Sequence, residues 1–162
     1  MFNIDYLRNE GFEGFYSIKK LKLNCNRVPK VKGVYVVCRH QNYKSKYLRQ
    51  SCGGWYKSDP TVEVTKLKSK WIENTDVLYI GRAGGTKEKT TLHSRIKAYM
   101  QFGSGLPISH WGGRYIWQLR GHNNFLVAVK VLHKEEPAKL ETKMLEDFIS
   151  IYGKLPFANL RR

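Results

Sequence analysis

Acidic residues are scarce in this chain. Its 162 residues include 13 Asp plus Glu against 29 Lys plus Arg, which gives a formal net charge of +16. A surplus of this size favours a polyanionic partner, either nucleic acid or an anionic membrane surface. An aromatic content of 13% indicates a packed domain and argues against a disordered basic tail.

Long apolar runs and paired cysteines are also missing. No stretch approaches the roughly 20 apolar residues of a membrane span, and the first ten residues contain acids and no apolar segment. We therefore expect a cytoplasmic protein with no signal peptide and no membrane partner. Cys25, Cys38 and Cys52 form no C-x-x-C pair. Free thiols are favoured over a disulfide framework, or over a zinc site that would add His40.

The spacing of apolar residues predicts one α/β (α+β) domain over residues 1–162. We expect a small, partly antiparallel sheet of about three to five strands flanked by helices. An N-terminal extension, 1–30, would precede it, with a short helix or strand near 16–23. A basic insertion, 40–75, would separate the first two core strands and carry a hairpin of its own. Strands are predicted at 31–39, 76–81, 115–119 and 125–133, and helices at 91–102 and 137–152.

The last predicted helix carries a glutamate on its apolar side. At about 100° per residue, Glu141 lies near the middle of the apolar face, whereas Glu146 lies on the polar face. That apolar face is formed by Leu140, Met144, Phe148, Ile151 and Tyr152. A buried carboxylate without a partner is costly, so Glu141 must be neutralised, paired or bound to a metal. Pairing with a core lysine or arginine remains an alternative to a metal.

Five short motifs occur in order along the chain: "GVY" at 33–35, "YIG" at 79–81, "RIKAY" at 95–99, "AKLE" at 138–141 and "PFAN" at 156–159. Together they resemble the GIY-YIG nuclease family, over about residues 31–160 apart from the insertion. Two spacings depart from the family pattern. The insertion separates the first two motifs, and Glu146 would match the usual distance to Asn159 better than Glu141 does. We keep Glu141 because it faces inward.

The resemblance implies a Mg²⁺-dependent DNA endonuclease, restriction-like or borne by a phage or mobile element, with Mn²⁺ as an alternative metal. Glu141 would bind the metal and Arg95 would clamp a phosphate oxygen. One tyrosine would take the proton of the attacking water, and we favour Tyr35 as the base and Tyr79 as the orienting residue. The implied catalytic residues are Tyr35, Tyr79, Arg95, Tyr99, Glu141 and Asn159. His93 and His110 are given no role, since a lone histidine near a loop is usually a neutral bystander.

Basic residues predict where DNA, expected to be double-stranded, would bind. The expected contacts are Arg82, Lys97, Arg114, Lys44, Lys46, Arg49, Lys68 and Lys70. Aromatics interleave the cations of the insertion, either to contact DNA or to anchor the segment to the core. We expect residues 43–70 to be replaceable by a short loop without loss of the fold. The alternative function is a non-catalytic basic nucleic-acid-binding module on a degenerate nuclease fold, and a homodimer on DNA stays open.

Overall fold

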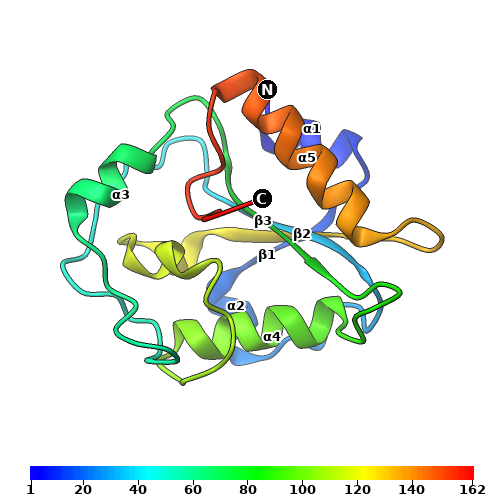
Figure 1. Cartoon of the computed structure of the whole chain (residues 1–162), viewed down its shortest axis with the longest axis horizontal. Coiled ribbons are helices and arrows are strands. Elements are labelled where there is room, and N and C mark those ends of the chain that lie inside the picture. Colours follow the sequence, from blue (N-terminus) through cyan, green and yellow to red (C-terminus); the bar gives the residue numbers. More distant parts are fainter.

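A four-stranded antiparallel sheet organises the chain in the computed structural model, which describes all 162 residues (Figure 1). The spatial order is β1-β4-β2-β3, so β3 lies at one edge. The expected α+β class and number of strands are confirmed. The strands are β1 (Glu13–Ser17), β2 (Gly33–Cys38), β3 (Val77–Ala83) and β4 (Leu126–Val131).

Helices cover both faces of the sheet, which creates two hydrophobic cores (Figure 1). One face packs against α1 (Ile4–Asn9) and α5 (Pro137–Tyr152), and the other packs against α2 (Ile18–Leu23) and α4 (Leu92–Gly103). The remaining helical segments are α3 (Val64–Lys70) and the two 3₁₀ helices η1 (Arg114–Gln118) and η2 (His122–Asn124).

The strand sequences explain how two cores form. Side chains alternate between the faces of a strand, and β2 is buried on both sides. In β2, Val34 and Val36 enter the core under α5, while Tyr35 and Val37 enter the core under α4. The β-branched run that predicted this strand is therefore the continuous apolar run of a strand buried on both faces.

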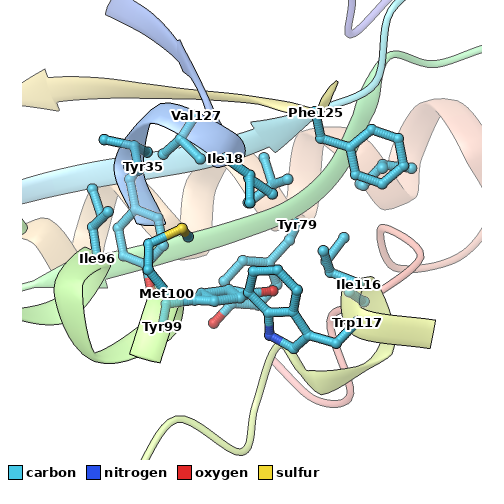
Figure 2. Packing of buried hydrophobic residues seen from close by; sticks show 14 of the residues in the cluster. Ile18, Tyr35, Tyr79, Ile96, Tyr99, Met100, Ile116, Trp117, Phe125 and Val127 are labelled. Carbon is cyan, nitrogen blue, oxygen red and sulfur yellow. The ribbon is translucent and has the colours of Figure 1, made fainter. Parts of the chain in front are cut away.

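A bulge in β3 changes the alternation. Cys38 pairs with Val77 and Val37 pairs with Tyr79, so Leu78 is the extra residue. As a result Leu78 and Tyr79 both enter the core under α4. Figure 2 shows the outcome, in which Tyr35 and Tyr79 from neighbouring strands lie in one cluster with Tyr99 of α4.

The predicted limits of the two long helices are confirmed. The Thr91 side chain caps α4 by accepting a hydrogen bond from the Ser94 N–H, and Pro137 opens α5. Gly153 ends α5 at φ +75°, a conformation that favours glycine. One position on the predicted apolar face is wrong: Ile151 is exposed, although the next residue, Tyr152, packs on Phe148.

The strand predicted at 115–119 is wrong. This segment forms η1, and all of its residues from Tyr115 to Gln118 are buried. A short apolar run that is buried all round carries no periodicity, so the sequence pattern cannot distinguish a strand from a helical turn. Residues 1–30 supply β1 at the far edge of the sheet and add Leu7 and Leu21 to the two cores.

The predicted insertion is part of the core and has no hairpin. It contains α3, whose Leu67 is fully buried in the larger cluster. Tyr43 packs on Phe125, and Trp71 packs on Phe157. The packing of Tyr43 and Leu67 argues against the expectation that a short loop can replace residues 43–70, because removing these side chains would open the core under α4.

The three cysteines are unpaired, as the sequence analysis expected. Cys25 and Cys38 are buried in opposite cores and Cys52 is exposed, so all three are free thiols that no shared zinc ion joins. No helix combines the length and the apolar character that a membrane span requires.

The C-terminal tail covers the outer edge of β3. The Asn159 amide binds both backbone groups of Ile80: its Nδ2 donates to the Ile80 carbonyl at 2.9 Å, and the Ile80 N–H donates to its Oδ1 at 3.0 Å. The Ala158 N–H also donates to the Leu78 carbonyl at 2.8 Å. The tail thus pairs a strand edge that would otherwise be open.

Replacing Asn159 with alanine should destabilise the protein by about 2 kcal/mol, because two buried backbone groups of Ile80 lose their partners. Chemical denaturation would measure the change in the free energy of unfolding. Asn159→Asp is the matched control. It keeps an acceptor for the Ile80 N–H but sets a buried carboxylate oxygen against the Ile80 carbonyl, so a loss at least as large as that of Asn159→Ala is expected. An unchanged stability in Asn159→Ala would show that the tail does not hold this edge.

Candidate active site

An open cleft of about 640 Å³ lies at the edge of β3. Because the tail covers only part of this edge, side chains from both faces of the sheet meet there. The wall has five cations against two carboxylates, which favours an anionic ligand. The lining residues are Lys57, Tyr79, Arg82, Glu88, Arg95, Trp111, Gly112, Glu141, Asn159, Leu160, Arg161 and Arg162.

Four of the six predicted catalytic residues line this cleft: Tyr79, Arg95, Glu141 and Asn159. They come from β3, α4, α5 and the tail. The other two, Tyr35 and Tyr99, lie buried directly behind it, with ring centroids 6.0 Å and 5.5 Å from that of Tyr79. All six predicted residues therefore lie together.

Glu141 is paired with an arginine, which was the alternative to a metal in the sequence analysis. Its side chain is 22% exposed, and its Oε2 accepts a hydrogen bond from Nε of Arg82 at 2.8 Å. Arg82 also binds Glu88 at 3.1 Å, so one guanidinium bridges both carboxylates of the cleft. Burial raises the pKa of Glu141, and Arg82 opposes that rise. Glu146 is exposed, as predicted.

The oxygen ligands of the cleft can be tested against the needs of Mg²⁺. That ion takes one or two carboxylates and completes its shell with water and phosphate oxygens. Both oxygens of Glu88 are occupied, by Arg82 and Thr90, and the Asn159 Oδ1 accepts from Ile80. The Oε1 of Glu141 accepts no hydrogen bond within the protein, so Glu141 fits a divalent cation and the other two do not.

Arg95 carries a charge that no acid in the protein neutralises. It makes no ion pair, its hydrogen bond to the Ser109 carbonyl is long at 3.5 Å, and its buried Nε has no acceptor. Its charge lowers the pKa of Tyr79 and of Glu141, although burial outweighs it in both. Arg82 is ion-paired with two carboxylates and Arg95 with none, so Arg95 is the better residue to receive an anion.

The glycine of "YIG" makes room for the tyrosine of "GVY". Gly81 lies directly opposite Tyr35 in the β2–β3 register. A Cβ at residue 81 would stand 2.7 Å from the Tyr35 hydroxyl oxygen and 2.9 Å from Cε1 of Tyr79. Only glycine therefore lets both rings approach the same point of the sheet.

The two tyrosines differ in access to the cleft. Tyr79 is 8% exposed and lines it, whereas Tyr35 is 1% exposed and lies beneath. Burial raises the pKa of Tyr79 to about 12 and raises the pKa of Tyr35 well above its ordinary value. Tyr35 lowers the pKa of Tyr79, while Tyr79 raises that of Tyr35. Of the pair, Tyr79 is thus the one whose hydroxyl can meet a ligand in the cleft.

His110 is the residue that the sequence analysis missed. Its Nε2 lies 2.8 Å from the Tyr35 hydroxyl oxygen, and its ring packs against Tyr99 at a centroid distance of 4.0 Å. It is 1% exposed, and its Nδ1 has no partner. Burial lowers the pKa of His110 to about 3, so the ring is neutral at physiological pH. A lone histidine in "SHWGGR" gave no signal, because its partner is 75 residues away.

The predicted DNA contacts divide into two groups. Arg82 lines the cleft. Arg114 stacks on the cleft residue Trp111, with its Cζ 4.4 Å from the centroid of the indole ring. Lys97 instead lines a separate groove between α2 and α4. The remaining cations lie outside the cleft, on the segment from 40 to 75: Lys44, Lys46, Arg49, Lys68 and Lys70.

Comparison with protein-family models, curated proteins and solved structures finds no match for this chain.

His110 should make stability depend on pH. Its pKa is about 3 in the folded protein and near 6.5 when unfolded, so the unfolded chain binds an extra proton between these values. Stability from this group is complete above about pH 6.5 and falls as the pH drops toward 3, by up to about 1.4 kcal/mol per pH unit.

Denaturation of the wild type and of His110→Gln at about pH 4, 5, 6 and 7 would test this dependence. The variant should show a shallower loss of stability than the wild type over this range, since glutamine does not titrate. Parallel curves would contradict a neutral, buried His110.

Proposed function

We propose that this chain is a metal-dependent endonuclease that hydrolyses phosphodiester bonds of DNA with a GIY-YIG-like site. The observation that carries the proposal is the convergence of Tyr79, Arg95, Glu141 and Asn159 on one cationic cleft. These residues come from four segments that are distant in the sequence, and the sequence motifs had predicted all four as catalytic. The net charge of +16 supports a polyanionic substrate.

Hydrolysis of a phosphodiester needs a proton acceptor for water and positive charge near the phosphoryl oxygens. The free guanidinium of Arg95 supplies charge where a phosphate would enter. A divalent cation held by Glu141 would supply a Lewis acid for the phosphate and the water. Asn159 holds β3 in place, so that Tyr79 stays fixed relative to Arg95.

The positions of the two tyrosines favour Tyr79 as the base that takes the proton of the attacking water. The sequence analysis favoured the reverse, with Tyr35 as the base and Tyr79 as the orienting residue. Tyr79 reaches the cleft, whereas Tyr35 is almost fully buried beneath it. Tyr35 lies behind it, with the neutral His110 ring on its hydroxyl. In this proposal Tyr79 takes the proton of the water, while Tyr35 and His110 hold the local network of phenols in position.

The competing function is a nucleic-acid-binding module without chemistry. The ion pair between Arg82 and Glu141 favours it, because the carboxylate already has a counterion at 2.8 Å. A plasmid-nicking assay with Mg²⁺, with Mn²⁺ and with EDTA separates the two. Cleavage that EDTA abolishes supports the enzyme, and binding without cleavage under either metal supports the module.

Glu141→Gln should lower DNA cleavage by about 100-fold or more, because the amide cannot hold a cation as a carboxylate does. DNA affinity should change little, since the overall positive charge supplies most of it. Glu146→Gln is the matched control on the exposed side of the same helix and should retain activity. Loss of activity in Glu146→Gln with normal cleavage by Glu141→Gln would reverse the assignment.

Tyr79→Phe should lower cleavage by about 100-fold or more, as expected for removal of a general base. Tyr35→Phe should cost less, because its hydroxyl does not reach the cleft. Both changes keep the ring, so circular dichroism should be unaltered. Single-turnover rates would be compared. An inactive Tyr35→Phe beside a normal Tyr79→Phe would return the role of base to Tyr35.

A further inference from the structure

A short loop beside the cleft presents two aromatic side chains to solvent. The Ser51 N–H donates to the Thr61 Oγ1 at 2.9 Å and closes the base of the loop. Near its tip, Trp55 is 65% exposed and Tyr56 is 45% exposed. The neighbouring Lys57 is also exposed and lines the cleft.

The outward position of these rings differs from that of the other aromatics in the same segment. Tyr43, Tyr47 and Trp71 pack on one another or on core rings and anchor the segment. Trp55 and Tyr56 make no such ring contact. Single exposed apolar residues are ordinary, but two adjacent large rings beside a cationic cleft are not explained by folding.

The loop is held against the C-terminal end of α4. The Gly54 N–H donates to the Phe102 carbonyl at 2.9 Å. A Cβ on Gly54 would lie 1.8 Å from the Leu106 carbonyl oxygen, so the two backbones touch. The aromatic tip therefore has a fixed base, which lowers the entropy lost when a ligand stacks on it.

The same support connects the loop to the cleft wall. Phe102 contacts the Trp111 ring at a centroid distance of 6.2 Å and blocks any side chain at Gly53. Trp111 lines the cleft and carries Arg114 on its face. Flat rings and cations thus continue from the cleft to the loop tip, in the combination that binds single-stranded nucleic acid.

We propose that Trp55 and Tyr56 form a stacking surface for unpaired bases of a DNA strand whose phosphate enters the cleft. Lys57 contacts the backbone of that strand between the rings and the cleft. The inference rests on the proposed nuclease function and narrows its substrate to DNA with unpaired bases beside the scissile phosphate. In an intact duplex the faces of the bases are already covered by their neighbours, so these rings gain nothing from it.

Binding is tested without metal, in EDTA, so that the result does not depend on hydrolysis. Fluorescence-labelled single-stranded oligonucleotides and blunt duplexes of the same sequence would be titrated at one salt concentration. Trp55→Ala and Tyr56→Ala should each weaken single-strand binding by about tenfold and leave duplex binding close to that of the wild type.

Three further variants control for shape and for general apolar contact. Trp55→Phe keeps a flat ring and should retain most of the affinity for single strands. Trp55→Leu keeps an apolar side chain without a flat face and should bind as weakly as Trp55→Ala. Ile151→Ala removes another exposed apolar side chain, on α5, and should bind like the wild type.

The outcomes separate this inference from the proposed function. Equal single-strand affinity in the wild type and Trp55→Ala, or full affinity in Trp55→Leu, would overturn the stacking surface. An equal loss of duplex binding would overturn the restriction to unpaired bases. A wild type that binds single strands through Trp55, yet cleaves no DNA with Mg²⁺ or Mn²⁺, would reject the nuclease function alone.

Discussion

The position of β3 at the edge of the sheet is the constraint on which the candidate site depends. One side of the strand pairs with β2, and the other is held at Ile80 by the Asn159 amide. Because the tail covers only part of the outer edge, residues from opposite faces of the strand reach a common cleft. Tyr79 enters from the face under α4, and Arg82 reaches Glu141 on α5. An interior strand would keep these two groups in separate cores.

Charge within the cleft is distributed unevenly, and this asymmetry distinguishes its two central arginines. Arg82 bridges Glu141 and Glu88, so its charge is compensated inside the protein. Arg95 has no acidic partner and lies near four titratable groups whose pKa values it lowers: Tyr35, Tyr79, His110 and Glu141. An incoming phosphate would satisfy Arg95 without competing with a carboxylate. The same field favours the deprotonated form of the phenols, against the opposing effect of burial.

The sequence predicted the features that depend on interactions between neighbouring residues. Thr91, Pro137 and Gly153 marked helix limits because capping depends on only a few neighbouring residues. The motif order identified Tyr79 and Glu141, but it could not reveal that Arg82 pairs with Glu141 or that His110 meets Tyr35. Both contacts join residues more than fifty positions apart, and no spacing rule encodes them. The strand prediction at 115–119 was wrong for a related reason. These residues are buried on all sides, so they lack the periodicity that distinguishes a strand from a helical turn.

The aromatic side chains of residues 40–75 fall into two groups: some pack on the core, and others are exposed to solvent. From the sequence alone, rings for anchoring and rings for binding look the same. In the structure Trp71 lies between Arg39 and Phe157 and is committed to the core, so it cannot also stack on a ligand. Trp55 has the same chemistry but is exposed, and the two glycines before it let the backbone lie against Phe102 and Leu106 at the end of α4. Because the neighbouring Lys57 lines the cleft, this backbone leaves the Trp55 ring beside the cleft with its face open to solvent.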